Sequence, residues 1–172
     1  MLTLNAVTVR LGGHVVLDRA SASIPPGSRV GLVGRNGAGK STLLKIIAGI
    51  AETDGGTVET PRNTRIGYLA QEAPGGTATP FETVLAADTE RTRLLEEAER
   101  TTDIHRIGEI HDRLNAIEAH AAPARAAQIL AGLGFDEAAQ RRPCREYSGG
   151  WRMRVALAAV LFLEPELLLL DE

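Results

Sequence analysis

The chain is 172 residues long, which is enough for one domain with a hydrophobic core or for part of a larger protein. Its hydrophobic content of 44% is ordinary for a globular protein and excludes an intrinsically disordered chain. The formal net charge of −3 provides no overall positive field that would attract nucleic acid.

The N-terminal part contains several short apolar stretches that are typical of strands. Residues 2–9 alternate approximately between apolar and polar, as in a half-buried strand. A glycine pair predicts a turn into a second short strand at 15–17, and a third apolar stretch ends at the Pro-Pro-Gly turn of residues 25–27. We expect residues 29–33 to form a strand that leads into the next segment.

Residues 34–41, Gly-Arg-Asn-Gly-Ala-Gly-Lys-Ser, fit the phosphate-binding P-loop pattern at every required position. The three glycines can adopt backbone angles closed to other residues, so successive N–H groups can turn inward around a phosphate chain. Lys40 can follow the β- and γ-phosphates, and the Ser41 hydroxyl can ligate Mg²⁺. The predicted strand before the loop, the helix after it and the Lys-Ser pair disfavour an ordinary glycine turn. The residues expected to bind nucleotide are Gly34, Arg35, Asn36, Gly37, Ala38, Gly39, Lys40, Ser41 and Thr42.

The helix that begins at Lys40 is expected to pack its apolar side chains on a sheet and to stop near Gly49. Two more strands are predicted at 57–59 and 65–69. Gln71 follows the second of them. A glutamine at a strand end near a P-loop can ligate Mg²⁺ or orient an attacking water, but on its own it is also compatible with a solvated loop.

From Phe81 the composition becomes acidic and arginine-rich, with apolar residues at helical spacing. A second apolar stripe runs over residues 104–117, preceded by a plausible cap at Thr102-Asp103. These patterns predict a two-helix hairpin. The residues predicted to share a stripe of its first helix are Val84, Leu85, Leu94, Leu95 and Ala98.

His105, His111 and His120 lie in this region, but their spacing does not place all three on one helix face. We interpret them as solvated surface histidines in preference to metal ligands. A third helix is predicted at 124–133, ending at glycines in the usual C-terminal manner.

Two motifs close the sequence. In Tyr147-Ser-Gly-Gly-Trp-Arg-Met-Arg, Ser148 can cap a helix, while Gly149 and Gly150 leave its first N–H groups uncovered for an anion; both interpretations stay open. Residues 167–172, Leu-Leu-Leu-Leu-Asp-Glu, are typical of a buried strand that ends in two carboxylates. In a P-loop protein such a pair indicates a Mg²⁺ ligand and a water-activating base, although a strand can also simply end in solvent.

The single cysteine, Cys144, excludes an internal disulfide and indicates a reducing compartment. The N-terminus lacks the features of a secretion signal, and the longest apolar run, residues 155–163, is far shorter than the roughly 20 residues of a membrane span. We expect a soluble, cytoplasmic protein with no transmembrane segment in this chain.

The four motifs, in this order, resemble those of ATP-binding cassette (ABC) ATPases over essentially the whole chain. Walker A corresponds to residues 34–41, the Q-loop glutamine to Gln71, the signature to residues 148–150, and Walker B to 167–171. The sequence also resembles one branch, the ABC-F proteins, which carry two cassettes in one polypeptide and no membrane domain. Its pointers are Trp151 and the residues around it in place of the usual Leu-Ser-Gly-Gly-Gln, the hairpin, and the Leu-Leu-Leu-Leu-Asp-Glu ending.

The resemblance implies an α/β fold: a P-loop NTPase cassette with an antiparallel β subdomain and a helical subdomain that carries the inserted hairpin. Residues 1–172 would form a partial nucleotide-binding domain. Its β and P-loop core would comprise 1–80 and 160–172, its helical subdomain 81–147 and its signature helix 148–159. The D-loop, the switch histidine and the second cassette of such proteins would follow Glu172, so we expect this sequence to be part of a longer protein.

In such proteins two cassettes close face to face with ATP between them. The resemblance implies that Lys40 holds the nucleotide, that Ser41, Gln71 and Asp171 hold its Mg²⁺, and that Glu172 activates water. Ser148, Gly149 and Gly150 would act in trans, on the ATP of the second cassette. The 172 residues alone are therefore expected to bind ATP weakly and not to hydrolyse it.

Members of the ABC-F branch include ribosome-associated ATPases that act in translation, which makes the ribosome the expected partner. The alternative is the ATP-binding subunit of a membrane ABC transporter, and a DNA-repair type scaffold is excluded because the helical insert is too short. Two departures are notable. The adenine-stacking aromatic residue has no clear counterpart, since Leu11 or His14 stands near its place, and the hairpin is more acidic than basic, which argues against a direct grip on RNA.

Overall fold

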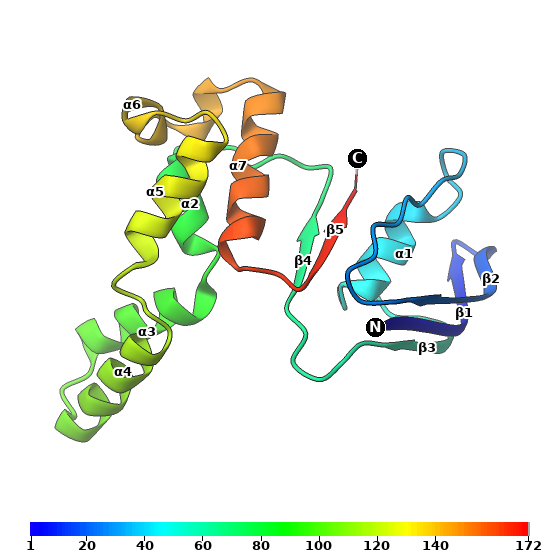
Figure 1. The fold of residues 1–172 in the computed structure, drawn as a ribbon, viewed down its shortest axis with the longest axis horizontal. Coiled ribbons are helices and arrows are strands. Elements are labelled where there is room, and N and C mark those ends of the chain that lie inside the picture. Colours follow the sequence, from blue (N-terminus) through cyan, green and yellow to red (C-terminus); the bar gives the residue numbers. More distant parts are fainter. Residues whose placement is uncertain (172) are drawn as a thin grey trace. The chain divides into compact units, whose positions relative to one another are not determined.

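The computed structural model describes residues 1–171 (Figure 1). It divides into two compact units, one formed by Met1–Ala70 together with the chain from Pro165 onward, and the other by Gln71–Glu164. The first unit is α/β and the second is helical. In the part of the chain that is described, no helix combines the length and the hydropathy needed to span a bilayer.

An antiparallel sheet of three strands begins the first unit. It consists of β1 (Leu2–Leu11), β2 (His14–Ile24) and β3 (Gly55–Glu59), in the order β2-β1-β3. Gly12 and Gly13 form the turn between β1 and β2, both with positive φ. The expected second and third apolar stretches belong to one strand, because β2 continues to pair with β1 from Leu11↔His14 to Leu2↔Ile24.

Helix α1 (Lys40–Ile47) joins this sheet to a second, parallel one in a shared core. The parallel sheet is formed by β4 (Ile66–Leu69) and β5 (Leu167–Leu170), whose register pairs Leu69 with Leu170. The buried side chains of this core are Leu2, Leu4, Val7, Val9, Ile46, Ile47 and Leu169. Helix α1, through Ile46 and Ile47, and strand β5, through Leu169, are therefore anchored to the same hydrophobic cluster.

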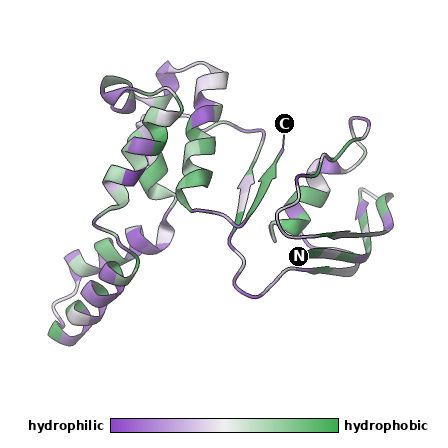
Figure 2. Cartoon of the chain, viewed as in Figure 1, coloured by the Kyte–Doolittle hydropathy of each residue, from purple (hydrophilic) through white to green (hydrophobic). Residues whose placement is uncertain are grey.

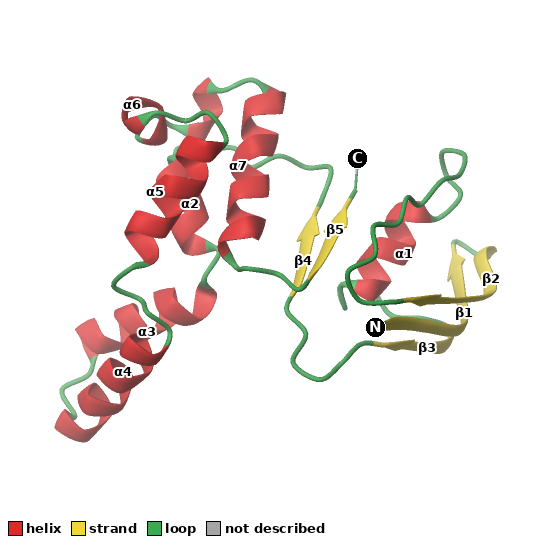
Figure 3. Ribbon diagram, viewed as in Figure 1, coloured by secondary structure: helices red, strands yellow, loops and turns green. Residues whose placement is uncertain are grey.

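The predicted strand at 29–33 is wrong. Figure 3 draws the whole connection between β2 and α1 as loop, and Val30 and Val33 are 64% and 93% exposed. A strand is stabilised by hydrogen bonds to a neighbour. None of the strands among residues 1–171 pairs with this segment, so its β-forming composition alone does not make it a strand.

The second unit is made of helices. They are α2 (Pro80–Ala86), α3 (Thr89–Arg100), α4 (Ile104–Ala116), α5 (Ala122–Gly132), α6 (Glu137–Gln140) and α7 (Gly149–Phe162), with a 3₁₀ turn at Cys144–Glu146. Its core contains aliphatic side chains, two phenylalanines and the free cysteine. The fully buried members are Val84, Ala122, Ala126, Leu130, Phe135, Cys144, Val155, Ala158 and Phe162.

The apolar stripe expected on one helix is divided between two. Helix α2 begins with a capping box in which Thr79 and Glu82 bond each other's backbone N–H groups. It ends before Asp88, whose carboxylate accepts from the Arg91 N–H at 2.9 Å and caps α3. The single-helix prediction failed because it followed hydrophobic spacing and overlooked this internal cap.

The predicted hairpin is confirmed as α3 and α4. The expected cap at Asp103 is present, since its carboxylate accepts from the N–H groups of His105 and Arg106. His105, His111 and His120 are all exposed, as predicted. Figure 2 shows how polar the hairpin is compared with β5, which is coloured as hydrophobic along its length.

Candidate functional site

The P-loop depends on its second and third glycines for different reasons. Gly37 and Gly39 have φ values of 81° and 90°, in the left-handed region that L-residues with side chains disfavour. A Cβ added to Gly39 would in addition overlap Cγ1 of Val16 on β2. Gly34 does not adopt positive φ; its role in the loop is to supply a carbonyl, described next.

Lys40 is the first residue of α1, and its side chain turns back over the loop. Its Nζ donates to the carbonyl oxygen of Gly34 at 2.8 Å and to that of Arg35 at 3.2 Å. Within the described chain no carboxylate lies within ion-pair distance of this amine. Its positive charge therefore sits beside the glycine turn without a competing anion, in a position suited to a phosphate group.

Ser41 and Asp171 meet at the edge of the parallel sheet, although they are 130 residues apart in the sequence. The Ser41 hydroxyl donates to Oδ1 of Asp171 at 2.9 Å. Asp171 directly follows β5, and Ser41 is the second residue of α1, so the shared core holds both. A hydroxyl and a carboxylate oxygen are hard donors of the type that Mg²⁺ prefers, and the pair fits such an ion.

Tyr68 is a functional candidate that sequence reasoning missed. Its hydroxyl donates to Oδ2 of Asp171 at 3.1 Å, so each carboxylate oxygen accepts one side-chain hydrogen bond. Burial raises the pKa of the Tyr68 phenol, and the hydrogen bond to Asp171 and the negative charge of that carboxylate raise the pKa further. The phenol is therefore a neutral donor at physiological pH. The sequence signal that could have identified Tyr68 was its position three residues before Gln71. The strand that contains Tyr68 pairs with β5.

For the other predicted site residues among those described, the structure shows exposure and location but no contact that indicates a function. Arg35, Asn36 and Ala38 are exposed in the loop, and Thr42 is half-buried on α1. Gln71 is exposed and is the first residue of the helical unit, so its approach to the P-loop stays a prediction. Glu172 lies outside the described residues, and its role as a base also stays a prediction.

The predicted signature segment, residues 148–150, lies at the start of α7. Ser148 occupies the N-cap position with extended backbone angles, but its side chain makes no capping hydrogen bond. The first helical bond is that of the Arg152 N–H to the Ser148 carbonyl at 2.9 Å. The N–H groups of Gly149 and Gly150 thus precede the helical ladder, at an exposed helix N-terminus that favours an anion. Of the two open interpretations, the side-chain cap is absent at Ser148.

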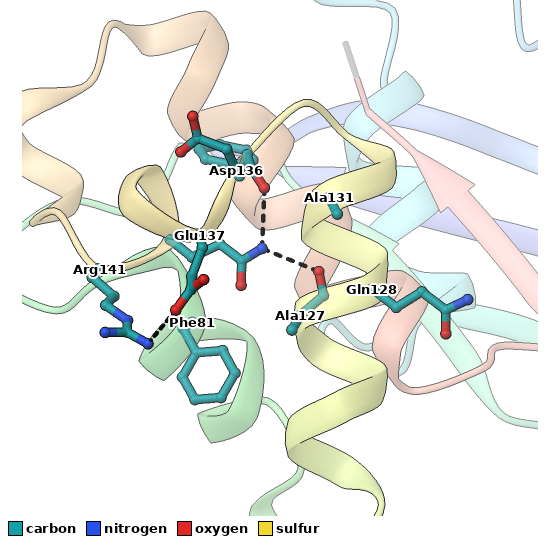
Figure 4. Close-up of a pocket in the computed structure, with 9 residues that line it drawn as sticks. Phe81, Ala127, Gln128, Ala131, Asp136, Glu137 and Arg141 are labelled. Carbon is teal, nitrogen blue, oxygen red and sulfur yellow. Dashed lines mark hydrogen bonds and ion pairs between the residues drawn. The ribbon is translucent and has the colours of Figure 1, made fainter.

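A surface pocket of about 580 Å³ lies elsewhere in the helical unit. It is lined by Phe81 of α2, by residues of α5 such as Ala127 and Ala131, and by the start of α6 (Figure 4). Its polar side is partly neutralised, because Glu137 and Arg141 form an ion pair at 2.7 Å. None of the residues that line it belongs to the P-loop or to residues 148–150.

The comparisons with known proteins agree with this arrangement. A family model described as "ABC transporter" matches residues 17–172. The chain is 42% identical to the probable ATP-binding protein YheS of Escherichia coli, and the match covers all of this chain and 28% of that protein. It is 43% identical to the ATP-binding cassette sub-family F member 3 of Homo sapiens, covering 95% of this chain and 24% of the relative. The chain thus spans about a quarter of the length of these curated relatives.

Solved structures show the same fold at lower sequence identity. MJ0796, described as a bacterial ABC transporter cassette, matches with a TM-score of 0.70 and 22% identity, over 100% of this chain and 74% of that one. A putative metal-chelate type ABC transporter matches with a TM-score of 0.69 and 22% identity, over 99% of this chain and 60% of that one. The predicted cassette fold, with its antiparallel and helical parts, is confirmed. The chain belongs to the ABC transporter family of ATP-binding cassettes, as an ABC-F type member.

Proposed function

We propose that this chain is a nucleotide-binding part of a two-cassette ABC-F ATPase that binds Mg²⁺-ATP and, in the full-length protein, hydrolyses it in the cytoplasm. The observation that carries the proposal is the 2.9 Å contact between Ser41 and Asp171, with the Lys40 amine at the neighbouring glycine turn. These groups are three of the parts that phosphoryl transfer requires: a phosphate cradle, a mobile cation and oxygen ligands for a metal.

Each residue of the site has a role that follows from its chemistry. The backbone of residues 34–41 binds the phosphate chain through its N–H groups, and Lys40 moves from the loop carbonyls to the terminal phosphates. Ser41 and Asp171 would hold Mg²⁺, with Gln71 as a further ligand or as the residue that orients water. Bound there, Mg²⁺ would neutralise charge that develops on the phosphate oxygens. Glu172 accepts a proton from the attacking water.

The proposed partner of this site is a second cassette, carried on the same full-length chain. MJ0796 was solved as a dimer, and also in a dimeric post-hydrolysis state bound to ADP and Pi. By analogy, residues 148–150 contact the nucleotide bound to the other cassette, and the uncapped N–H groups at the start of α7 support this role. Nucleotide-dependent closure of the pair is then a switch.

The ribosome is the proposed target of this switch, and the support is the chain's similarity to sub-family F members. The alternative, an ATP-binding subunit of a membrane transporter, is not favoured because similar proteins carry F-family names or the name YheS. No feature of the described residues identifies a transported substrate.

Replacement of Lys40 by alanine in the full-length protein tests the nucleotide site. We expect the affinity of this site for Mg²⁺-ATP to fall at least about tenfold, because a charge-assisted contact to phosphate is lost. The melting temperature should change little, since Lys40 is solvent-accessible and bonds only to carbonyls of its own loop.

The matched control is Lys45→Ala, because Lys45 is an exposed lysine on the same helix. Isothermal titration calorimetry of the wild type and both variants distinguishes the two positions. An unchanged affinity in Lys40→Ala, with the second cassette's site disabled, contradicts the P-loop assignment.

A further inference from the structure

The side chains of the signature segment, residues 148–150, make almost no contacts that would fix its position. Ser148 makes no capping hydrogen bond. A Cβ added to Gly149 or Gly150 would meet nothing within 4 Å. Apart from the helical hydrogen bond between the Arg152 N–H and the Ser148 carbonyl, the position of these three residues must therefore be set by the residues that flank them.

The flanking residues are both aromatic and both pack on one buried ring. Phe135 is fully buried, and its ring centroid lies 5.5 Å from that of Tyr147 and 5.0 Å from that of Trp151. The interplanar angles are 73° and 83°, the edge-to-face geometry that aromatic pairs favour. Tyr147 immediately precedes Ser148, and Trp151 immediately follows Gly150. The segment is thus held at both of its ends by the same side chain.

Polar contacts orient the two outer rings. The Tyr147 hydroxyl donates to the carbonyl oxygen of Ala139 at 2.6 Å. The guanidinium of Arg154 lies 4.6 Å from the centroid of the Trp151 ring and donates to the carbonyl oxygen of Leu133 at 3.3 Å. On the other side of the turn, a Cβ added to Gly134 would lie 3.5 Å from the Trp151 ring. Trp151 is therefore confined although it is 37% exposed.

We propose that Phe135, Tyr147 and Trp151 form an aromatic clamp whose function is to position residues 148–150 for the nucleotide of the second cassette. This rests on the proposed role of that segment in trans. The three are positioning residues: they do not contact the nucleotide, but they fix the direction of the N–H groups that do. The orientation of such groups contributes much of an enzyme's rate, since displacing them by about 1 Å can lower the reaction rate up to about 100-fold.

The test uses ATP hydrolysis by the full-length protein. We expect Trp151→Ala to lower kcat about tenfold with little change in the Kd for Mg²⁺-ATP, because the segment contributes more to the transition state than to ground-state binding. Trp151→Phe should restore most of the rate, since a phenylalanine ring can still pack on Phe135. The matched control is Leu161→Ala, a residue on the same helix with the same 37% exposure and no part in the clamp.

A double-variant cycle separates positioning from general destabilisation. Ser148→Arg blocks the segment directly, so in that background Trp151→Ala should have no further effect on kcat. The clamp is disproved if Trp151→Ala behaves like Leu161→Ala, or if its effect persists undiminished in the Ser148→Arg background. A Ser148→Arg variant with the wild-type rate contradicts the proposed role of the segment itself. If Trp151→Ala does not fold, Trp151→Leu replaces it in the cycle, with the same two expectations.

Discussion

At the scale of single residues, Asp171 is the point where separate parts of the first unit converge. One of its carboxylate oxygens accepts from Ser41 on α1 and the other from Tyr68 on β4. A carboxylate held at both oxygens has a defined orientation, and a metal ligand needs one. Sequence motifs name Ser41 and Asp171 but contain no position for the phenol.

Replacement of Tyr68 by phenylalanine tests this arrangement. The ring remains in the core, but Oδ2 of Asp171 loses its donor, so the carboxylate can rotate. We expect the Mg²⁺ concentration for half-maximal ATP hydrolysis by the full-length protein to rise about tenfold or more, as is typical when the partner of a ligand is lost. Titration of the rate with Mg²⁺ at saturating ATP measures it.

The control for this variant is Tyr147→Phe, which removes a tyrosine hydroxyl of the helical unit that donates to the carbonyl oxygen of Ala139. It should leave the Mg²⁺ dependence unchanged even if it alters the maximal rate. A Mg²⁺ requirement that is equal in the wild type and in Tyr68→Phe would show that the phenol does not support the ligand.

At the scale of elements, the α3–α4 hairpin carries two ion pairs that join its two helices. Arg106 on α4 donates to Glu97 on α3 at 2.6 Å, and Arg113 on α4 donates to Glu90 on α3 at 2.7 Å. Leu94 and Ile110 are its buried apolar side chains, while Ile104 is 83% exposed, so few buried side chains accompany the ion pairs. The hairpin is therefore expected to respond to pH more than the rest of the helical unit.

The hydrogen bond from Arg106 lowers the pKa of Glu97, and the hydrogen bond from Arg113 lowers the pKa of Glu90. A carboxyl whose pKa is lower in the folded state stabilises the fold above its unfolded pKa, and this contribution disappears as the pH falls through the folded-state value. We expect the amide protection of α3 and α4 to decrease below about pH 4.5. Hydrogen exchange followed by mass spectrometry between pH 7 and 3 measures it.

Glu97→Gln should remove part of this pH dependence and lower the protection already at neutral pH. Glu96→Gln is the matched control, because Glu96 pairs only within its own helix, with Arg100 at 3.7 Å. If both variants show the same pH profile as the wild type, the ion pairs across the hairpin do not contribute to its stability.

At the scale of the whole molecule, the chain combines a candidate nucleotide site in its first unit with a segment in its second that is proposed to serve another nucleotide. Each unit has its own hydrophobic core. This division suits the proposed switch, because the residues proposed to bind one nucleotide and those proposed to contact the other belong to separately packed units.

Glu172→Gln in the full-length protein tests what the switch acts on. The amide keeps the shape of the side chain but cannot accept a proton, so the protein should bind ATP, remain closed and co-sediment with ribosomes when ATP is present. Sucrose-cushion sedimentation with ATP and with ADP measures this. Lys40→Ala is the control, and it should lose the ATP-dependent part of the co-sedimentation with ribosomes. Sedimentation with membranes and not with ribosomes would favour the transporter alternative.

Much of this protein was predictable from local sequence. The P-loop could be recognised because its chemistry resides in a continuous backbone turn, where glycines at positions 37 and 39 supply positive φ and Lys40 follows directly. The hairpin, its cap at Asp103 and the strand before Asp171 were also predictable, since hydrophobic period and capping residues act over a few positions. The predicted burial of that strand is correct only for Leu169, because Leu168 and Leu170 are 38% and 57% exposed.

Tertiary structure decided the rest. Tyr68 becomes part of the site only because β4 pairs with β5 and brings its phenol to Asp171. Phe135 contacts the aromatic rings on both sides of residues 148–150 only because the helical unit packs it against Tyr147 and Trp151. Residues 29–33 have the composition of a strand but lack a partner among the described residues, and they stay a loop. Local patterns specify backbone conformation through interactions a few residues long, whereas strand pairing and side-chain contacts depend on which distant segments are brought together.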